Sequence, residues 1–216
     1  MSKIRLCYTQ GEEVKFISHL DFLRTITRVF RRAELPVKYS EGFNPHMVMT
    51  IGLPLSVGTT SVCDCLDVEL TKEMDPEEIK RRINECTPRG IKINSARKAE
   101  GLKPLFQIDS ALYETTFSTD ISIDVSKYIE KDEIMIEKKS KRKVNEVNIK
   151  DFIRNIEISE SNGTNHRLKL HINAGNFSNL KPELVIKSME MFFDCKATDI
   201  KIERKEIYFD DMTKVC

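Results

Sequence analysis

The chain has 216 residues, of which 40% are hydrophobic and 32% are charged, and its formal net charge is +1. This composition is that of an ordinary globular protein of one or two domains, large enough to form a core without a disulfide or metal staple. A net charge so close to zero excludes a uniformly basic surface, so any contact with nucleic acid requires a local patch.

The N-terminal part begins with a strand and a helix. Residues 3–9 alternate apolar and polar side chains, which predicts a strand. Ser18 and Asp21 have the spacing of a capping box, which predicts a helix from there to about residue 33, ended by Pro36. Its apolar face is expected to contain the residues at helical spacing: Leu20, Leu23, Ile26, Thr27, Phe30 and Ala33.

The elements that follow complete one folding unit. Asp75 is expected to cap a second helix with Pro76 in its first turn, and that helix ends near Pro88. The remaining expectations are extended segments at 37–40 and 47–55, a turn at 42–46, and strands at 61–70 and 91–99. The order strand, helix, strands, helix, strand predicts a ferredoxin-like split βαβ unit over residues 1–100, with an antiparallel sheet and both helices on one face.

Residues 97–110 are interpreted as a connector to a second unit. The expected elements are a strand at 112–118, a short helix at 124–131, a hairpin of 133–139 and 144–149, a strand at 166–173, a helix from about 181 to 193, and a strand at 199–209. We therefore predict an α+β protein of two tandem ferredoxin-like units, the second a degenerate copy over residues 111–216. A less regular second unit is the alternative.

Six scattered cysteines are interpreted as free thiols of a cytoplasmic protein, because no secretory leader or membrane-spanning run is visible. Cys63 and Cys65 alternate on a strand and could bind a metal together with His19 or His46. One C-x-C pair is weak evidence for such a site, and small buried hydrophobes are the better interpretation. No metal and no cofactor are therefore expected.

The first helix carries four arginines. Arg24, Arg28, Arg31 and Arg32 stand at i, i+4, i+7 and i+8, which predicts one stripe beside or opposite the apolar face. Arginine offers bidentate geometry to phosphate, and Asp21 can neutralise part of the stripe. A phosphate-binding face and an ordinary solvated helix face both remain open as interpretations.

The segment Ser40–Gly58 contains glycines, prolines and no lysine or arginine. Gly42 and Pro45 are expected to shape a turn that displays Phe43, Asn44 and His46, although strand reversal alone would explain it. His19, beside the helix cap, is expected to be a structural histidine. Either His19 or His46 could serve as a base, but no nucleophile or second acid is identifiable nearby.

Two further segments are candidates for RNA contact. The densest charge run, at the tip of the predicted hairpin, could hold an RNA backbone or simply be solvated; it consists of Lys138, Lys139, Lys141, Arg142 and Lys143. Asn179 could cap the helix that follows it, where exposed backbone N–H groups could meet a phosphate, although an ordinary helix start is the favoured interpretation.

These motifs together resemble a bacterial family known as radical-SAM-linked proteins. The family pattern is a Ser-His-Leu-Asp helix start (Ser18–Asp21), paired arginines (Arg31, Arg32) before Leu-Pro, Ser-x-Gly-Phe-Asn-Pro-His (Ser40–His46) and Pro-Leu-x-x-Gly (Pro54–Gly58). A weaker similarity continues to the Asn-Leu-Lys-Pro-Glu segment (Asn179–Glu183). Met47 departs from a common Pro, and Glu34 from a common Gly.

The resemblance implies a partner, a radical S-adenosylmethionine protein, because this chain lacks that enzyme's cluster cysteines. Such enzymes often modify RNA, so we hypothesise a non-catalytic RNA-binding or substrate-presenting module. One alternative is a metal-independent ribonuclease that uses His19 or His46, since CRISPR-repeat endoribonucleases are similar at the level of the predicted fold. The other is a protein-interaction module that binds only the partner, through residues 47–57.

Overall fold

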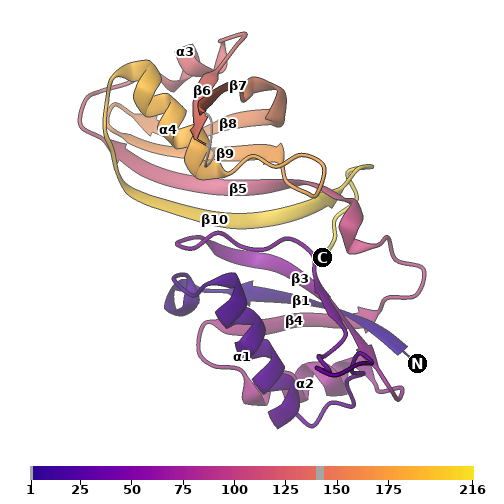
Figure 1. Ribbon diagram of the computed structural model, residues 1–216. Helices are drawn as coiled ribbons and strands as arrows, with labels where there is room; N and C mark the ends of the chain where they lie inside the picture. Colours follow the sequence, from indigo (N-terminus) through magenta and orange to yellow (C-terminus); the bar gives the residue numbers. More distant parts are fainter. Residues whose placement is uncertain (1, 140–143) are drawn as a thin grey trace. The chain divides into compact units, whose positions relative to one another are not determined.

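A computed structural model describes residues 2–139 and 144–216 of the chain (Figure 1). It confirms an α+β protein in which the strand pairings are largely antiparallel. The chain divides into two compact units. Unit 1 contains residues 1–108 and 204–216, and unit 2 contains residues 109–203. The sequence predicted one unit over residues 1–100 and a second over 111–216. The structure differs from this division because the last 13 residues of the chain belong to unit 1.

Unit 1 has an antiparallel sheet in the order β4-β1-β3-β2. Its elements in chain order are β1 (Ser2–Gln10), a 3-10 turn (Glu12–Val14), α1 (His19–Arg32), β2 (Met49–Ile51), β3 (Thr60–Leu70), α2 (Pro76–Cys86), β4 (Ile91–Lys98) and a second 3-10 turn (Leu105–Gln107). The core lies where α1 and α2 pack on this sheet, and residues from all three are buried there. Only three residues of the predicted extended segment 47–55 form a strand.

The two helices of unit 1 begin where local sequence signals predict. The hydroxyl of Ser18 accepts the backbone N–H of Asp21, and the carboxylate of Asp75 accepts that of Glu78. The predicted apolar face of α1 is wrong in part. The buried residues are Phe22, Ile26, Val29, Phe30 and Ala33, whereas the Leu20 side chain is 62% exposed.

Unit 2 contains the strands β10-β5-β9-β8 as neighbours and a separate hairpin of β6 and β7. Its elements are β5 (Ile108–Thr119), α3 (Val125–Ile129), β6 (Met135–Lys139), β7 (Val144–Asn148), a 3-10 turn (Lys150–Phe152), β8 (Ile153–Asn162), β9 (Asn165–Asn173), α4 (Pro182–Phe193) and the first part of β10 (Ala197–Phe209). The sequence did not predict β8, because irregular register after Ile153 and after Ile158 breaks the alternation that marks a strand.

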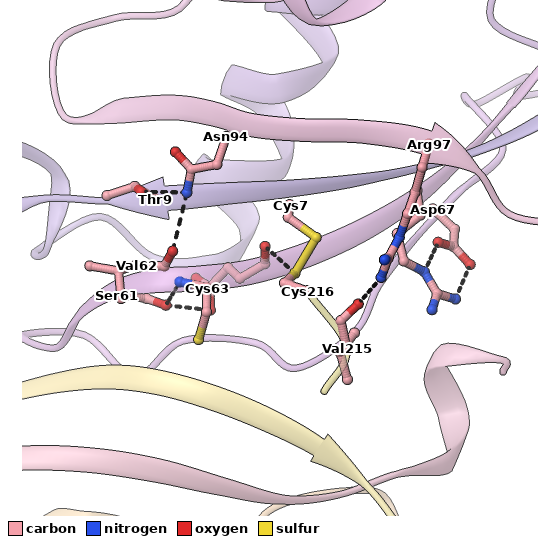
Figure 2. The surroundings of a disulfide bond; sticks show 12 residues. Cys7, Thr9, Ser61, Val62, Cys63, Asp67, Asn94, Arg97, Val215 and Cys216 are labelled. Atoms are coloured by element: carbon pink, nitrogen blue, oxygen red, sulfur yellow. Dashed lines mark hydrogen bonds and ion pairs between the residues drawn. A yellow bond between two sulfur atoms is a disulfide. The ribbon is translucent and has the colours of Figure 1, made fainter. Parts of the chain in front are cut away.

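The end of the chain returns to unit 1 and is held there by covalent and polar contacts. Cys216 forms a disulfide with Cys7 of β1, and the guanidinium of Arg97 donates to the carbonyl of Val215 (Figure 2). This corrects the prediction that all six cysteines are free thiols. Two cysteines far apart in sequence meet because the last residues fold back onto β1, whereas Cys63, Cys65, Cys86 and Cys195 are free.

No helix within the two described ranges is long and apolar enough to cross a membrane.

Candidate functional site

Three of the predicted site residues of α1 and one of the Ser40–His46 turn line a single open groove in unit 1. The groove has a volume of about 510 Å³ and lies between α1, the turn and β2. Its lining combines guanidinium, imidazole and apolar groups: Arg24, Arg28, Arg31, His46, Leu20, Leu23, Thr27, Pro45, Met47 and Met49. We call it the arginine groove.

The spacing on α1 explains why leucines and arginines share this face. Residues three and four apart on a helix are neighbours on its surface, so Leu20 is a neighbour of both Leu23 and Arg24. Phe22, Ile26 and the other buried residues occupy the opposite side of the helix, which faces the sheet. The arginine stripe therefore lies opposite the buried face, with the exposed Leu20 within it and the partly buried Leu23 at its edge.

The arginines of the groove differ in how far their charge is neutralised. Arg24 pairs with Asp21 at 2.9 Å, and both side chains are well exposed. The pKa of the Asp21 carboxyl lies below its ordinary value because the Ser18 hydroxyl donates to it and Arg24 lies beside it. Within residues 2–139 and 144–216, neither Arg28 nor Arg31 has a carboxylate partner. Two uncompensated cations thus face solvent along the groove.

Arg32 does not belong to the groove, contrary to the predicted stripe of four. Its guanidinium donates to the backbone carbonyl of Cys86 at 2.7 Å. It therefore satisfies a free carbonyl at the end of α2. The reason is angular, since the next residue after Arg31 is rotated by about 100° around the helix.

The turn at Gly42–His46 is the tip of a small hairpin. Ser40 N–H donates to the His46 carbonyl at 2.8 Å, and Val48 N–H donates to the Lys38 carbonyl at 2.9 Å. Gly42 has a φ of +115°, which a glycine adopts readily and other residues rarely do. The prediction of a turn is confirmed, and it places His46 at the groove.

Ser40 fixes the imidazole of His46. Its Oγ accepts the backbone N–H of His46 at 3.1 Å and lies 2.9 Å from Nδ1. A serine Oγ can accept two hydrogen bonds and donate one, so it can either donate to Nδ1 or accept from it. Where Oγ donates, Nε2 of the neutral ring carries the proton and is a donor; where Oγ accepts, Nε2 is an acceptor.

The other two residues of the predicted tip do not line the groove. Phe43 is fully exposed and Asn44 is exposed as well. His19 lies elsewhere, in a cavity of about 10 Å³ lined also by Tyr8, Gln10 and Ser18. That volume is the space of about one water molecule. The two candidate histidines therefore do not share a site.

The cysteine pair of β3 has no third metal ligand beside it among the described residues. Burial raises the pKa of Cys63 to about 12 and raises that of Cys65 as well, with the Asp64 carboxylate as a second cause for both. A thiol held protonated is a poor metal ligand. No cluster of three or more His, Cys, Asp or Glu side chains able to hold a metal occurs in the described part of the chain.

The remaining candidates lie in unit 2. Lys138 and Lys139 end β6, whereas Lys141, Arg142 and Lys143 lie outside the described residues. The prediction that Asn179 caps α4 is wrong. The N-cap is Lys181, which makes no side-chain cap, and Asn179 instead forms a backbone bridge with Ala174.

The sequence did not identify the apolar part of the groove. Leu20 and Leu23 were assigned to the core, and the two methionines were interpreted as parts of an extended segment. Met47 is buried and Met49 partly so, yet both line the groove. The available signal was that α1 carries two apolar stripes, only one of which can face the sheet.

Comparison with known proteins identifies a family without assigning an activity. A family model described as "Uncharacterized protein conserved in bacteria (DUF2344)" matches residues 3–182. No curated protein matches. A solved chain of a Cbf5-Nop10-Gar1 complex is 11% identical with a TM-score of 0.49, over 95% of this chain and 48% of that chain. An unknown protein from Galdieria sulphuraria is 13% identical with a TM-score of 0.28, and the match covers 94% of this chain and 98% of that chain.

Proposed function

The chain belongs to DUF2344, a family of uncharacterized proteins conserved in bacteria, and we propose that it is a non-catalytic RNA-binding module whose arginine groove holds the RNA backbone. The observation that carries this proposal is the pair Arg28 and Arg31, two exposed cations without a carboxylate partner in the described ranges. They lie beside Arg24 and the imidazole of His46. Arginine binds phosphate bidentately and is less strongly hydrated than lysine, which suits a phosphate site.

The overall charge supports a localised contact. With a net charge of +1, long-range attraction to RNA is weak, so affinity must come from the few cations that reach phosphates. The groove supplies three guanidiniums from one helix face, and Asp21 offsets only the one on Arg24.

Substitution of the two unpaired arginines tests the proposal. We expect Arg28→Gln/Arg31→Gln to weaken binding of a single-stranded RNA 12-mer and to flatten its salt dependence. The slope of log affinity against log salt should fall by about 0.7 for each phosphate that the variant no longer binds. Fluorescence anisotropy of labelled RNA over a range of salt concentrations measures both quantities.

Arg89→Gln is the matched control, because Arg89 is an exposed arginine of unit 1 outside the groove. It should leave the affinity and the slope nearly unchanged. Wild-type protein that binds no RNA at low salt, or a double variant that binds with an unchanged slope, contradicts the proposal.

The ribonuclease alternative has less support than binding alone. His46 is the one histidine of the groove, its Nδ1 is engaged by Ser40, and His19 lines a separate cavity. General acid–base cleavage needs a second proton donor or acceptor within reach of the same substrate. RNA that remains intact with purified wild-type protein is the expected result.

The finer parts of the proposal rest on sequence and connectivity. The resemblance to radical-SAM-linked proteins supports a radical SAM partner in the cytoplasm, to which this chain presents RNA; absence of such an enzyme from complexes isolated from the native bacterium would contradict it.

For the fold, we infer two ferredoxin-like units. Unit 1 has the βαββαβ order, and unit 2 has the same order with the β6–β7 hairpin inserted.

A further inference from the structure

We propose that the arginine groove binds unpaired bases on its apolar floor, so that the chain selects single-stranded over double-stranded RNA. The inference rests on the proposed RNA-binding function and specifies its substrate class. It comes from a part of the groove that phosphate binding leaves unexplained, namely the apolar side chains that alternate with the cations.

The apolar floor is exposed where solubility alone would favour a polar residue. Leu20 is 62% exposed on α1, and Leu23 and Met49 are only partly buried in the same groove. Exposed apolar surface inside a hollow and edged by charge marks a binding site more often than an isolated exposed leucine does. A purely anionic ligand would leave this surface in contact with water.

The arrangement of the two kinds of side chain fits a nucleotide with its base turned out. Leu20, Leu23 and Arg24 lie within one turn of α1, and neighbours on such a face have Cβ atoms about 5–6 Å apart. A ligand that matches this face must therefore carry an anionic group and a flat apolar group next to each other. The volume of about 510 Å³ is within the range of sites that hold small molecules.

Double-stranded RNA cannot use both parts of the groove. In a duplex the bases are stacked and paired, so a protein meets phosphates, ribose and base edges but not the flat faces of the bases. In a single strand, bases can leave the stack and cover apolar side chains while the backbone follows the cations. The Nε2 of His46 then meets a complementary donor or acceptor on the base edge.

The experiment compares three labelled 12-mers by fluorescence anisotropy with the full chain. They are a single-stranded RNA of mixed sequence, the corresponding blunt duplex, and an abasic chain that keeps the phosphates without bases. We expect the single strand to bind at least about fivefold more tightly than either of the other two, since each base contact adds to the affinity.

A variant of the floor separates base contacts from charge. We expect Leu20→Ser to weaken single-strand binding about threefold or more while leaving the salt slope unchanged, because no cation is removed. Leu20 is exposed, so the fold should tolerate the change. Val57→Ser, at an exposed apolar residue outside the groove, is the matched control and should have no effect.

Each outcome distinguishes this inference from the function on which it rests. If the abasic chain or the duplex binds as tightly as the single strand, or if Leu20→Ser changes nothing, the inference is wrong while RNA binding through the arginines stands. If none of the three 12-mers binds, the proposed function fails as well. Binding of an acidic, apolar peptide in the groove in preference to RNA also overturns both.

Discussion

At the scale of single residues, Glu34 shows how tightly the end of α1 is constrained. Its φ is +50°, in the left-handed region that favours glycine. Its N–H donates to the carbonyl of Arg31, and the N–H of Leu35 donates to that of Phe30. This is the hydrogen-bond pattern of a Schellman motif, in which Glu34 stands at the position usually taken by glycine.

Replacing Glu34 with glycine should therefore stabilise unit 1. We expect Glu34→Gly to raise the free energy of unfolding by about 0.5–1 kcal/mol. Glycine removes the strain of a side chain in the left-handed conformation, and this gain outweighs the conformational entropy that glycine adds to the unfolded chain. Native-state hydrogen exchange of buried α1 amides measures the change in this unit. Glu100→Gly is the control, since Glu100 is exposed with a negative φ and should not be stabilised by glycine.

The candidate residues whose positions the sequence predicted are those fixed by local geometry. Arg24, Arg28 and Arg31 share a face because of helical periodicity, and the Gly42–His46 turn follows from glycine and proline chemistry. The predictions for Arg32 and Asn179 were wrong because the positions of these side chains depend on contacts that residue spacing does not specify. Arg32 meets the Cys86 carbonyl across the helix pair, and Asn179 meets Ala174 before α4 begins.

At the scale of elements, α1 illustrates what sequence patterns leave undecided. The helix carries two apolar stripes, one with Phe22, Ile26 and Phe30 and one with Leu20 and Leu23. Periodicity predicts the helix for either choice, and only the docking of α1 on the sheet decides which stripe is buried. The helix starts were predictable because Ser18 and Asp75 cap within their own turns, whereas β8 was not, because its irregular register hides the alternation.

The cap of α1 has a consequence that depends on pH. Ser18→Ala removes the acceptor for the Asp21 N–H, which typically destabilises a helix by about 1 kcal/mol. It also removes the hydroxyl that donates to the Asp21 carboxylate, the main cause of its lowered pKa. We therefore expect the pKa of Asp21 to rise toward its ordinary value in the variant, as followed by NMR titration of its side chain.

The sign of the pH effect follows from the direction of that shift. A carboxyl whose folded pKa is lowered stabilises the folded state above its unfolded pKa, and that contribution disappears as pH falls through the folded pKa. The difference in stability between wild type and Ser18→Ala should therefore shrink in that acidic window. Ser18→Thr retains the hydroxyl and should behave as wild type; a pKa of Asp21 that is the same in all three proteins would contradict the argument.

At the scale of the whole molecule, the chain leaves unit 1 after residue 108 and returns to it at residue 204. No local signal marks this return, and the disulfide between Cys7 and Cys216 joins residues 209 positions apart. The sequence therefore predicted the number and type of most elements but assigned the last segment to the second unit. What places it in unit 1 is a set of contacts that form only in the folded chain.

The central contact of this returning segment is a buried ion pair. The Arg204 guanidinium lies 2.7 Å from the Asp64 carboxylate and also donates to the carbonyls of Leu53 and Pro54. Asp64 accepts further hydrogen bonds from Gln10 and Ser61, and both partners of the pair are almost fully buried. Several donors on one buried carboxylate compensate for the loss of its hydration.

Removal of the arginine alone should therefore be far more harmful than removal of the pair. We expect Arg204→Met to destabilise unit 1 by about 3–5 kcal/mol, because Asp64 remains as a buried charge without its cation. The double variant Asp64→Asn/Arg204→Met removes that charge and should recover a large part of the stability. Hydrogen exchange of the buried amides of β1 and β3 measures the change, because two units of one chain need not unfold together. Equal destabilisation in the single and double variants would mean that Arg204 acts through packing and its backbone contacts, and that its charge is incidental to holding the returning segment in unit 1.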